Sequence, residues 1–384
     1  MQSNKKKTLF EDQLDDVFLK PIKGSAQPLH MNAPILKEFF YISISGKQPE
    51  FIQYNFEMYE HILTCRKDVN SPEIAYMNIM NAFMKLSDTT VDIKGVPHYG
   101  IKFIKKRTYE EIFHADKKVI LTWFEALKSY CVLTKFRNYF ESIKVLGQGA
   151  FAKVFLVKRL SDKQDFAVKV FNKAAIMEDP AEMKCLIYEI KIMRMMNHYR
   201  VLKMYEVYEG ENFIYCLCEW YKGSDLLKAI VKKGSQPEQK CLTIIFQILE
   251  GLYYMHSRGA MHRDLKPENI IFKQSSEIDI AIVDLGFATL EEDYKKLFVR
   301  CGTPGYVAPE ILNDKEYDCK VDVFSCGIIF YMIITGKIPF HGNNYKEVVS
   351  KNIKGKIDFD FIGTNVNIST HSKLISFEFI AANA

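Results

Sequence analysis

The sequence predicts an α+β protein with two structured regions, and three observations lead to this fold class. The chain has 384 residues, which is more than one ordinary domain. Residues 34–115 contain short runs rich in aromatic and β-branched residues, interrupted by Gly46 and Pro49, a pattern typical of strands. Beyond residue 139, strand-like runs around a glycine-rich turn give way to long helical patterns. Residues 1–33 are polar and show little periodicity, so we expect a flexible leader there.

The composition is that of an ordinary globular protein. Hydrophobic residues make up 48% of the chain and charged residues 26%, which excludes a fibrous or wholly disordered protein. The 52 basic and 47 acidic residues leave a net charge of +5, too small an excess to indicate nucleic-acid binding. None of the nine cysteines forms a C-x-x-C pair, and Cys216 and Cys218 share one face of a predicted strand, which favours packing over metal binding. We expect a reduced, intracellular protein without disulfides.

No stretch of the sequence is long and apolar enough to span a membrane. The most apolar run, residues 323–334, has about a dozen residues, whereas a spanning helix needs about 20; we expect a buried core helix. The start of the chain turns acidic where a signal peptide would be apolar. The lysines at residues 5–7 are fewer than a lipid-binding cluster requires. We expect a cytoplasmic protein, with peripheral attachment to membranes as the alternative.

The strand-rich region closes with a helical pattern over residues 118–136, in which apolar side chains such as Trp123 recur on one face. Many strands followed by one helix predict an antiparallel barrel or sandwich that the helix caps. This order of elements resembles a pleckstrin-homology (PH) domain, whose last helix carries a tryptophan at the place of Trp123. The resemblance covers residues 34–136.

The PH resemblance implies a docking module. Family members that bind phosphoinositides carry several basic side chains on the first two strands, whereas the corresponding stretch here offers only Lys47. Docking to a protein, or inhibition of the rest of the chain, is therefore the first expectation. Weak binding to membrane lipid is the alternative.

The second region opens with a glycine-rich turn at residues 147–149, between two strand-like runs. Glycine lets a backbone pass close to a ligand. Because a strand follows the turn, it fits a flap over phosphates better than a dinucleotide site, where a helix would follow. Lys169 lies in the apolar strand FAVKVF, on the same face as Ala167. A cation on a buried face needs an anionic partner, and Glu189 in the next helical pattern is the candidate.

The most specific signal is the run HRDLKPEN, which extends from His262 to Asn269. It is followed by IAIVDLGFA, which contains Asp284, and by CGTPGYVAPE, which ends at Glu310. In this order and spacing the motifs resemble those of eukaryotic protein kinases. The lysine in RDLKPEN is the serine/threonine form, and the whole stretch is most similar to the calmodulin-dependent-kinase group.

The kinase resemblance covers residues 140–384. It implies a two-lobed protein-kinase fold with a β-rich small lobe and an α-rich large lobe. It also implies a signalling serine/threonine kinase that transfers the γ-phosphoryl group of Mg-ATP to Ser or Thr hydroxyls of protein substrates. By the same resemblance, Asp264 orients the substrate hydroxyl, Lys266 stabilises the moving phosphoryl group, and Asn269 and Asp284 hold Mg²⁺. The implied ATP-binding residues are Leu146, Gly147, Gln148, Gly149, Val154, Ala167, Lys169, Glu189, Glu219, Tyr221 and Ile271.

The C-terminal part departs from the family pattern. The family's large lobe continues with helices whose arginine pairs with the glutamate at the place of Glu310, but no arginine follows Arg300 here. We therefore expect a large lobe that is shortened at its C-terminus and a Glu310 without that partner. A buried charge left without its partner costs about 3–5 kcal/mol. The alternative function is a weakly active or inactive kinase-like scaffold that binds nucleotide or partners.

Overall fold

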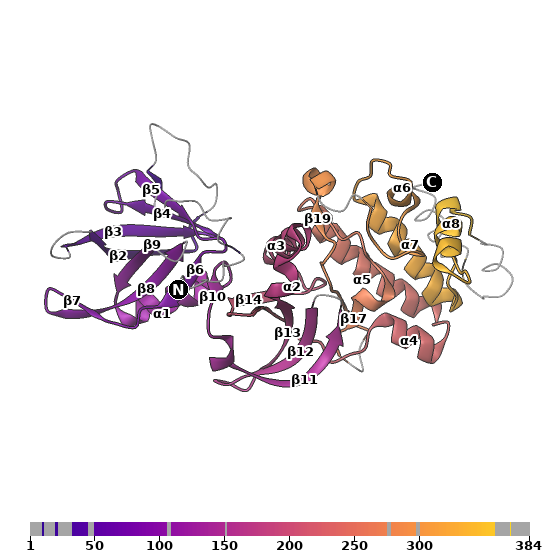
Figure 1. Cartoon of the computed structure of the whole chain (residues 1–384), viewed down its shortest axis with the longest axis horizontal. Helices are drawn as coiled ribbons and strands as arrows, with labels where there is room; N and C mark the ends of the chain where they lie inside the picture. Colours follow the sequence, from indigo (N-terminus) through magenta and orange to yellow (C-terminus); the bar gives the residue numbers. More distant parts are fainter. Residues whose placement is uncertain are drawn as a thin grey trace. The chain divides into compact units, whose positions relative to one another are not determined.

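The computed structural model describes residues 10, 20–21, 33–44, 50–105, 109–149, 152–274, 278–296, 300–357 and 369. It contains two compact units (Figure 1). The first consists of Met1–Glu178 and Tyr205–Cys218, and the second of Asp179–Met204 and Glu219–Ala384. Within the described ranges, no helix is long and apolar enough to cross a membrane. Most of the expected leader, Lys47, and nearly all of the chain beyond residue 357 lie outside the described residues.

The first unit is built mainly of strands. Their order in the sheet is β1-β5-β4-β3-β2-β9-β8-β6-β10-β14-β15-β13-β12-β11, with β7 paired to β8. The bounds of its elements are β1 Lys20–Pro21, β2 Leu36–Ile44, β3 Glu50–Tyr59, β4 Ile62–Arg66, β5 Glu73–Asn78, β6 Phe83–Leu86, β7 Val91–Ile93, β8 Val96–Lys105, β9 Tyr109–Ala115, α1 Lys117–Leu127, β10 Val132–Leu133, η2 Phe136–Asn138, β11 Phe140–Gln148, β12 Ala152–Arg159, β13 Asp165–Asn172, α2 Lys173–Met177, β14 Met204–Glu209 and β15 Phe213–Cys218.

Strands β2–β9 and helix α1 form an N-terminal β-domain. Strands β2, β3, β4 and β5 follow one another as antiparallel neighbours, and β9 pairs with both β2 and β8. Trp123 of α1 is 2% exposed and meets Phe40 edge-on, with 4.9 Å between the ring centroids. Phe56 and Phe113 extend this aromatic core, with their centroids 4.6 Å apart. The predicted strand-rich region with one helix is therefore confirmed, whereas its identity as a PH domain stays a prediction.

Helix α1 ends at Leu127, so the predicted helix over residues 118–136 is wrong in its second half. Val132 does not continue the helical bonding, because its N–H donates to the carbonyl oxygen of Ala82 at 2.9 Å. Together with Leu133 it forms β10, which pairs with β6 on one side and β14 on the other. Two strands that are distant in sequence supply the hydrogen bonds that a longer helix would have supplied, and local periodicity does not reveal them.

Strand β10 joins the N-terminal β-domain to strands β11–β15, which we call the distal sheet. Parallel pairing with both β6 and β14 makes one continuous path of strands through the first unit. The buried side chains on both sides form a single core, in which Phe136 stacks on Phe140 at 4.8 Å and on Tyr215 at 4.4 Å. Lys128 Nζ lies 2.9 Å from Oε1 of the buried Glu206 on β14. The first unit thus extends past the predicted end of the N-terminal domain, and that boundary stays a prediction.

The register of the distal sheet sorts its side chains onto two faces. Val154 is paired with Lys169, and Lys169 with Cys216, so these three lie on one face. Phe155 is paired with Val168, which places both on the opposite face. The face that carries Lys169 and the face that carries Phe155 are therefore separate surfaces of the same strands.

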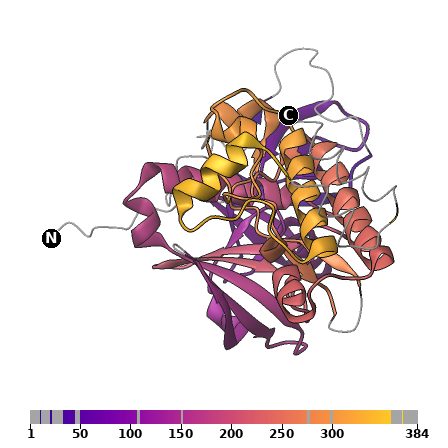
Figure 2. The same cartoon turned by 90° about the vertical axis from the view of Figure 1, so that its right-hand side faces the viewer.

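The second unit is mainly helical. Its helices α5 and α7 pack side by side (Figures 1 and 2). Helix α7 is buried over almost its whole length, which confirms that the most apolar run of the sequence forms a core helix. The bounds of its elements are α3 Pro180–Met195, α4 Leu226–Lys233, α5 Glu238–His256, β16 Ala260–Met261, η3 Pro267–Asn269, β17 Ile270–Phe272, β18 Ile280–Ile282, β19 Thr289–Leu290, η4 Glu291–Lys296, α6 Pro309–Leu312, α7 Lys320–Thr335 and α8 Tyr345–Lys354.

Candidate active site

The run HRDLKPEN links β16 to β17 and includes η3, and Asp322 of α7 anchors its first residues. The fully buried carboxylate of Asp322 accepts the backbone N–H groups of His262 and Arg263, each at 2.8 Å. His256 Nε2, at the end of α5, lies 2.9 Å from the same carboxylate. Burial by itself would raise the pKa of Asp322, but the hydrogen bond with His256 and the contacts with His262 bring that pKa below its usual value. The anchor is therefore ionised near neutral pH.

Asp264, Lys266 and Thr303 form a closed triangle of hydrogen bonds. Lys266 Nζ donates to Asp264 Oδ2 at 2.7 Å and to Thr303 Oγ1 at 2.8 Å. Thr303 Oγ1 in turn donates to Asp264 Oδ1 at 2.6 Å. Asn269 Nδ2 also lies 3.5 Å from Oδ2, so three donors hold the carboxylate in one orientation, and Oδ1 keeps a further lone pair. Such a fixed carboxylate can orient a hydroxyl group and accept its proton.

The ladder between β17 and β18 brings the two predicted metal ligands close along the backbone. Ile270 is paired with Ile282, and the N–H of Val283 donates to the carbonyl oxygen of Asn269 at 2.9 Å. Asp284 follows directly after Val283. Asn269 Nδ2 donates to the carbonyl oxygen of Asp264 at 2.9 Å, so its amide oxygen is the atom that can bind a cation.

Two residues of this region have backbone angles that non-glycine residues rarely adopt. The φ angles of Arg263 and Asp284 are 64° and 62°. Each such residue costs on the order of 1–3 kcal/mol, and such residues cluster at functional sites. Their surroundings hold both residues in place. Arg263 Nε donates to the Phe287 carbonyl oxygen at 2.9 Å, and Leu285, the neighbour of Asp284 in sequence, is fully buried.

Several predicted nucleotide-binding residues of the first unit lie on one face of the distal sheet. Val154, Ala167 and Lys169 share that face by register. Leu146, near the end of β11, is 41% exposed. A Cβ atom added at Gly147 would meet no atom within 4 Å, so packing does not require a glycine there. A glycine at this position would let a ligand approach the backbone closely, as the predicted nucleotide site requires.

Gln148, the last residue of β11, and Gly149 also belong to the first unit, whereas the remaining predicted nucleotide-binding residues belong to the second. The N–H of Glu219 donates to the Lys203 carbonyl oxygen at 2.9 Å, and the Tyr221 hydroxyl donates to the Glu219 carboxylate at 3.1 Å. Ile271 lies on β17, and Glu189 of α3 is 5% exposed. The second unit therefore brings together the predicted catalytic pair and the segments of the predicted metal ligands, while the first unit contains the glycine-rich segment and Lys169.

The structure adds information on two residues of the second unit, His256 and Glu310. Sequence reasoning assigns no role to His256, whose only signal is its place at the end of a helical run just before HRDLKPEN. Glu310 of α6 carries a buried oxygen, Oε2, that has no hydrogen-bond partner among the described residues. Burial raises the pKa of Glu310 above its usual value.

Comparison with known proteins adds the family. The family model described as "Protein kinase domain" matches residues 140–379. The chain is 39% identical over 226 residues to calcium/calmodulin-dependent protein kinase type 1 of Caenorhabditis elegans, covering 58% of this chain and 64% of that protein. It is 35% identical over 227 residues to calcium-dependent protein kinase 4 of Plasmodium berghei (strain Anka), covering 59% and 43%.

A plant relative shows the same pattern of partial coverage. The chain is 39% identical over 216 residues to CBL-interacting protein kinase 11 of Oryza sativa subsp. japonica, covering 55% of this chain and 42% of that protein. The match thus spans less than two thirds of the length of each of these three relatives. The family model, in contrast, covers more than half of the present chain. On this evidence the chain belongs to the protein kinase domain family.

Proposed function

We propose that this chain is an ATP-dependent serine/threonine protein kinase that transfers the γ-phosphoryl group of Mg-ATP to Ser or Thr hydroxyls of protein substrates in intracellular signalling. The observation that carries the proposal is the Asp264–Lys266–Thr303 triangle on a loop that Asp322 anchors. Phosphoryl transfer needs positioning and charge neutralisation rather than covalent chemistry. The family match and the relatives, which are named as protein kinases, support the proposal.

The catalytic roles follow from the chemistry of these side chains. Asp264 orients the substrate hydroxyl and accepts its proton as the new O–P bond forms. Lys266, a compact cation beside that carboxylate, neutralises negative charge on the group in transfer. Thr303 keeps the carboxylate in register by donating to Oδ1. All three contacts are present in the second unit by itself, so the pair is preorganised.

The residues present fit Mg²⁺. Asn269 and Asp284 offer oxygen atoms, the donor type that this hard cation prefers. Among the residues that the structure describes, no group of three or more His, Cys, Asp or Glu side chains could hold a metal. A site with two protein ligands suits Mg²⁺, which usually keeps waters and nucleotide phosphates as its other ligands. The ion supplies charge neutralisation on the phosphates when bound.

The residues of the first unit suit the nucleotide itself. Lys169 provides a cation for the α- and β-phosphates, and the turn at residues 147–149 covers the phosphates with backbone rather than side chains. Leu146, Val154 and Ala167 offer apolar contacts for the adenine ring. In the second unit, Glu219 and Tyr221 stand at the place that hydrogen-bonds the base in the family.

For the N-terminal β-domain we propose a PH-like docking module that acts on a protein partner, in a cytoplasmic kinase. The strand order, the capping helix and the buried Trp123 support this proposal. Sedimentation of the full chain with vesicles containing phosphoinositides tests the lipid alternative. We expect no sedimentation above that with neutral vesicles, and specific sedimentation would favour lipid as the partner.

The decisive experiment measures phosphate transfer from Mg-ATP to a basic serine peptide by the purified chain. Asp264→Asn should lower the rate about 10²–10⁴-fold, the usual contribution of a positioned base. Nucleotide should still raise the melting temperature of the Asp264→Asn variant. Asp314→Asn, at an exposed site, serves as the matched control and should keep the full rate. A wild-type chain that binds nucleotide but transfers no phosphate would make the scaffold alternative correct.

A further inference from the structure

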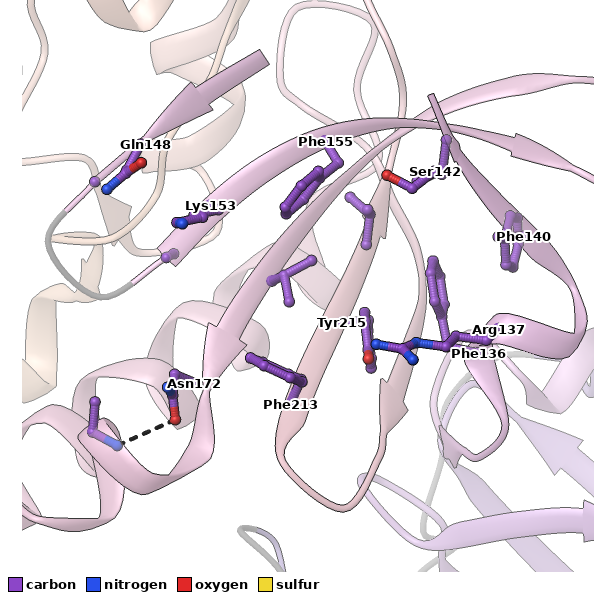
Figure 3. Close-up of a pocket in the computed structure, with 16 residues that line it drawn as sticks. Phe136, Arg137, Phe140, Ser142, Gln148, Lys153, Phe155, Asn172, Phe213 and Tyr215 are labelled. Atoms are coloured by element: carbon purple, nitrogen blue, oxygen red, sulfur yellow. Dashed lines mark hydrogen bonds between the residues drawn. The ribbon is translucent and has the colours of Figure 1, made fainter. Parts of the chain in front are cut away.

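The face of the distal sheet that carries Phe155 holds a cavity of about 830 Å³ (Figure 3). It lies within the first unit and is lined by residues of η2, β11, β12, β13, α2 and β15. Its volume falls in the range of roughly 300–1,000 Å³ that is usual for small-molecule sites. The register places Val154, Ala167 and Lys169 on the opposite face of the same strands. The cavity therefore lies on the other face from these three residues of the proposed nucleotide site, and it shares with that site only Gln148 and Gly149 among its described lining residues.

Aromatic rings form one wall of this cavity. Phe136 stacks between Phe140 and Tyr215, with interplanar angles of 14° and 8°. Phe213 extends this wall beyond Tyr215, and the centroids of the two rings are 6.3 Å apart. Aliphatic side chains and one further ring complete the apolar lining; these are Phe155, Val157, Val168 and Val170. A concave apolar surface of this kind on a folded protein usually marks a binding site.

The charge around the cavity has one sign. Arg137 and Lys153 stand on opposite sides of it, with the rings of Phe155, Phe213 and Tyr215 between them (Figure 3). Both cationic side chains belong to exposed residues. Neither has an ion-pair partner within the described part of the chain, and no Asp or Glu is found among the described lining residues. An anionic group of a ligand can therefore pair with either cation without competing against a carboxylate of the protein.

We propose that this cavity binds an amphipathic organic anion, with an elongated apolar body and a terminal carboxylate. The apolar body would lie against the stacked rings and the valines, with a gain of about 25 cal/mol for each Å² of apolar surface that it removes from water. The carboxylate would pair with Arg137 or Lys153. The ligand would also lie against Gln148 and Gly149, which end the cavity at the glycine-rich turn. It would thus rest on the back of the strands that carry Lys169.

A competition experiment on the full chain tests the class of ligand. Anilinonaphthalene sulfonate, an apolar fluorescent anion, is bound first and then displaced by dodecanoate, dodecanol or dodecylammonium, each below its micelle concentration. These three share one chain and differ in the charge of the head group. Dodecanoate should displace the dye at a concentration about fivefold lower than the other two, which corresponds to one exposed ion contact. Equal displacement by all three, a preference for the ammonium, or no dye binding would overturn the proposal.

Variants locate the binding at this cavity. The pair Arg137→Glu with Lys153→Glu should lower the affinity for dodecanoate about fivefold or more and leave the affinity for dodecanol within about twofold. The pair Lys118→Glu with Lys163→Glu makes the same change in net charge at exposed sites that do not line the cavity, and should change neither affinity.

A steric block provides the second variant. Ser142→Trp starts from an exposed position on β11 and fills the cavity, so dye and dodecanoate binding should both be lost. The melting temperature without ligand shows whether each variant is folded. If folded Ser142→Trp protein binds dodecanoate as well as the wild type, or if charge reversal at Arg137 and Lys153 has no effect, the cavity is not the site.

Discussion

The catalytic loop of the second unit and the β10 junction of the first unit both join segments that are far apart in sequence, but different forces hold them. In the loop, one buried carboxylate, Asp322, satisfies two backbone N–H groups and contacts His256. At the junction, Val132 and Leu133 pair with two strands inside an apolar core that includes stacked rings. The polar assembly should therefore respond to pH and to loss of single hydrogen-bonding atoms. The apolar assembly should respond to loss of volume.

The largest expected effect is at the loop anchor. Asp322→Ala leaves the N–H groups of His262 and Arg263 buried without an acceptor, so the free energy of unfolding should fall by about 3–5 kcal/mol. Urea denaturation measures the loss. Asp318→Ala, which removes one hydrogen bond to the Lys320 N–H from an exposed carboxylate, is the control and should cost about 1 kcal/mol or less.

The same anchor predicts a pH dependence. Because the pKa of Asp322 is lowered in the folded state, its stabilising contribution is present above the ordinary aspartate pKa and is lost as the pH falls through the folded value. The difference in stability between the wild type and Asp322→Asn should therefore narrow in acid. A difference that stays constant down to the acid transition would show that the charge of Asp322 plays no part.

A substitution at the β10 junction should lower the free energy of unfolding less, but it should affect strands on both sides of β10. Leu133→Ala leaves a cavity in the shared core, where Leu133 is 5% exposed, and should cost about 2–5 kcal/mol. Hydrogen exchange should speed up in both β6 and β14, which flank β10. Leu121→Ala, at a 45% exposed position of α1, should stay within about 0.5 kcal/mol of the wild type. Faster exchange in β14 alone would mean that the N-terminal β-domain and the distal sheet are independent.

The sequence predicts the two regions unequally, and the reason is physical. HRDLKPEN could be found because only a few residue types do its chemistry and because a short loop fixes their spacing. Strand β10 could not be found, since two apolar residues with partners on distant strands leave no periodic pattern, and many apolar residues would serve equally well. The end of α1 was predicted wrongly for the same reason. His256 was missed because its partner, Asp322, comes much later in the chain.

The ion pair at the junction gives an intermediate effect. Glu206 is 4% exposed, pairs with Lys128 at 2.9 Å and accepts the hydroxyl of Tyr208. Glu206→Gln removes one charge from this contact and should cost about 1–3 kcal/mol, whereas Glu125→Gln, at a 65% exposed site that also pairs with Lys128, should cost less than about 1 kcal/mol. A double-mutant cycle with Lys128→Met isolates the coupling. A coupling no larger than that of Glu125 with Lys128 would contradict a buried, specific pair.

The smallest effect contrasts with that of Asp322. Because burial raises the pKa of Glu310, the contribution of this group to stability is full below the ordinary glutamate pKa and is lost as the pH rises through the folded value. Glu310→Gln should therefore be neutral or stabilising, by up to about 1 kcal/mol, at pH 7, and the gain should vanish in acid. Urea denaturation at several pH values checks this, with the exposed Glu292→Gln as control. A large loss of unfolding free energy at pH 7 would mean that Glu310 has a cationic partner in the folded protein. Glu310 and Asp322 would then both stabilise the second unit as ionised carboxylates.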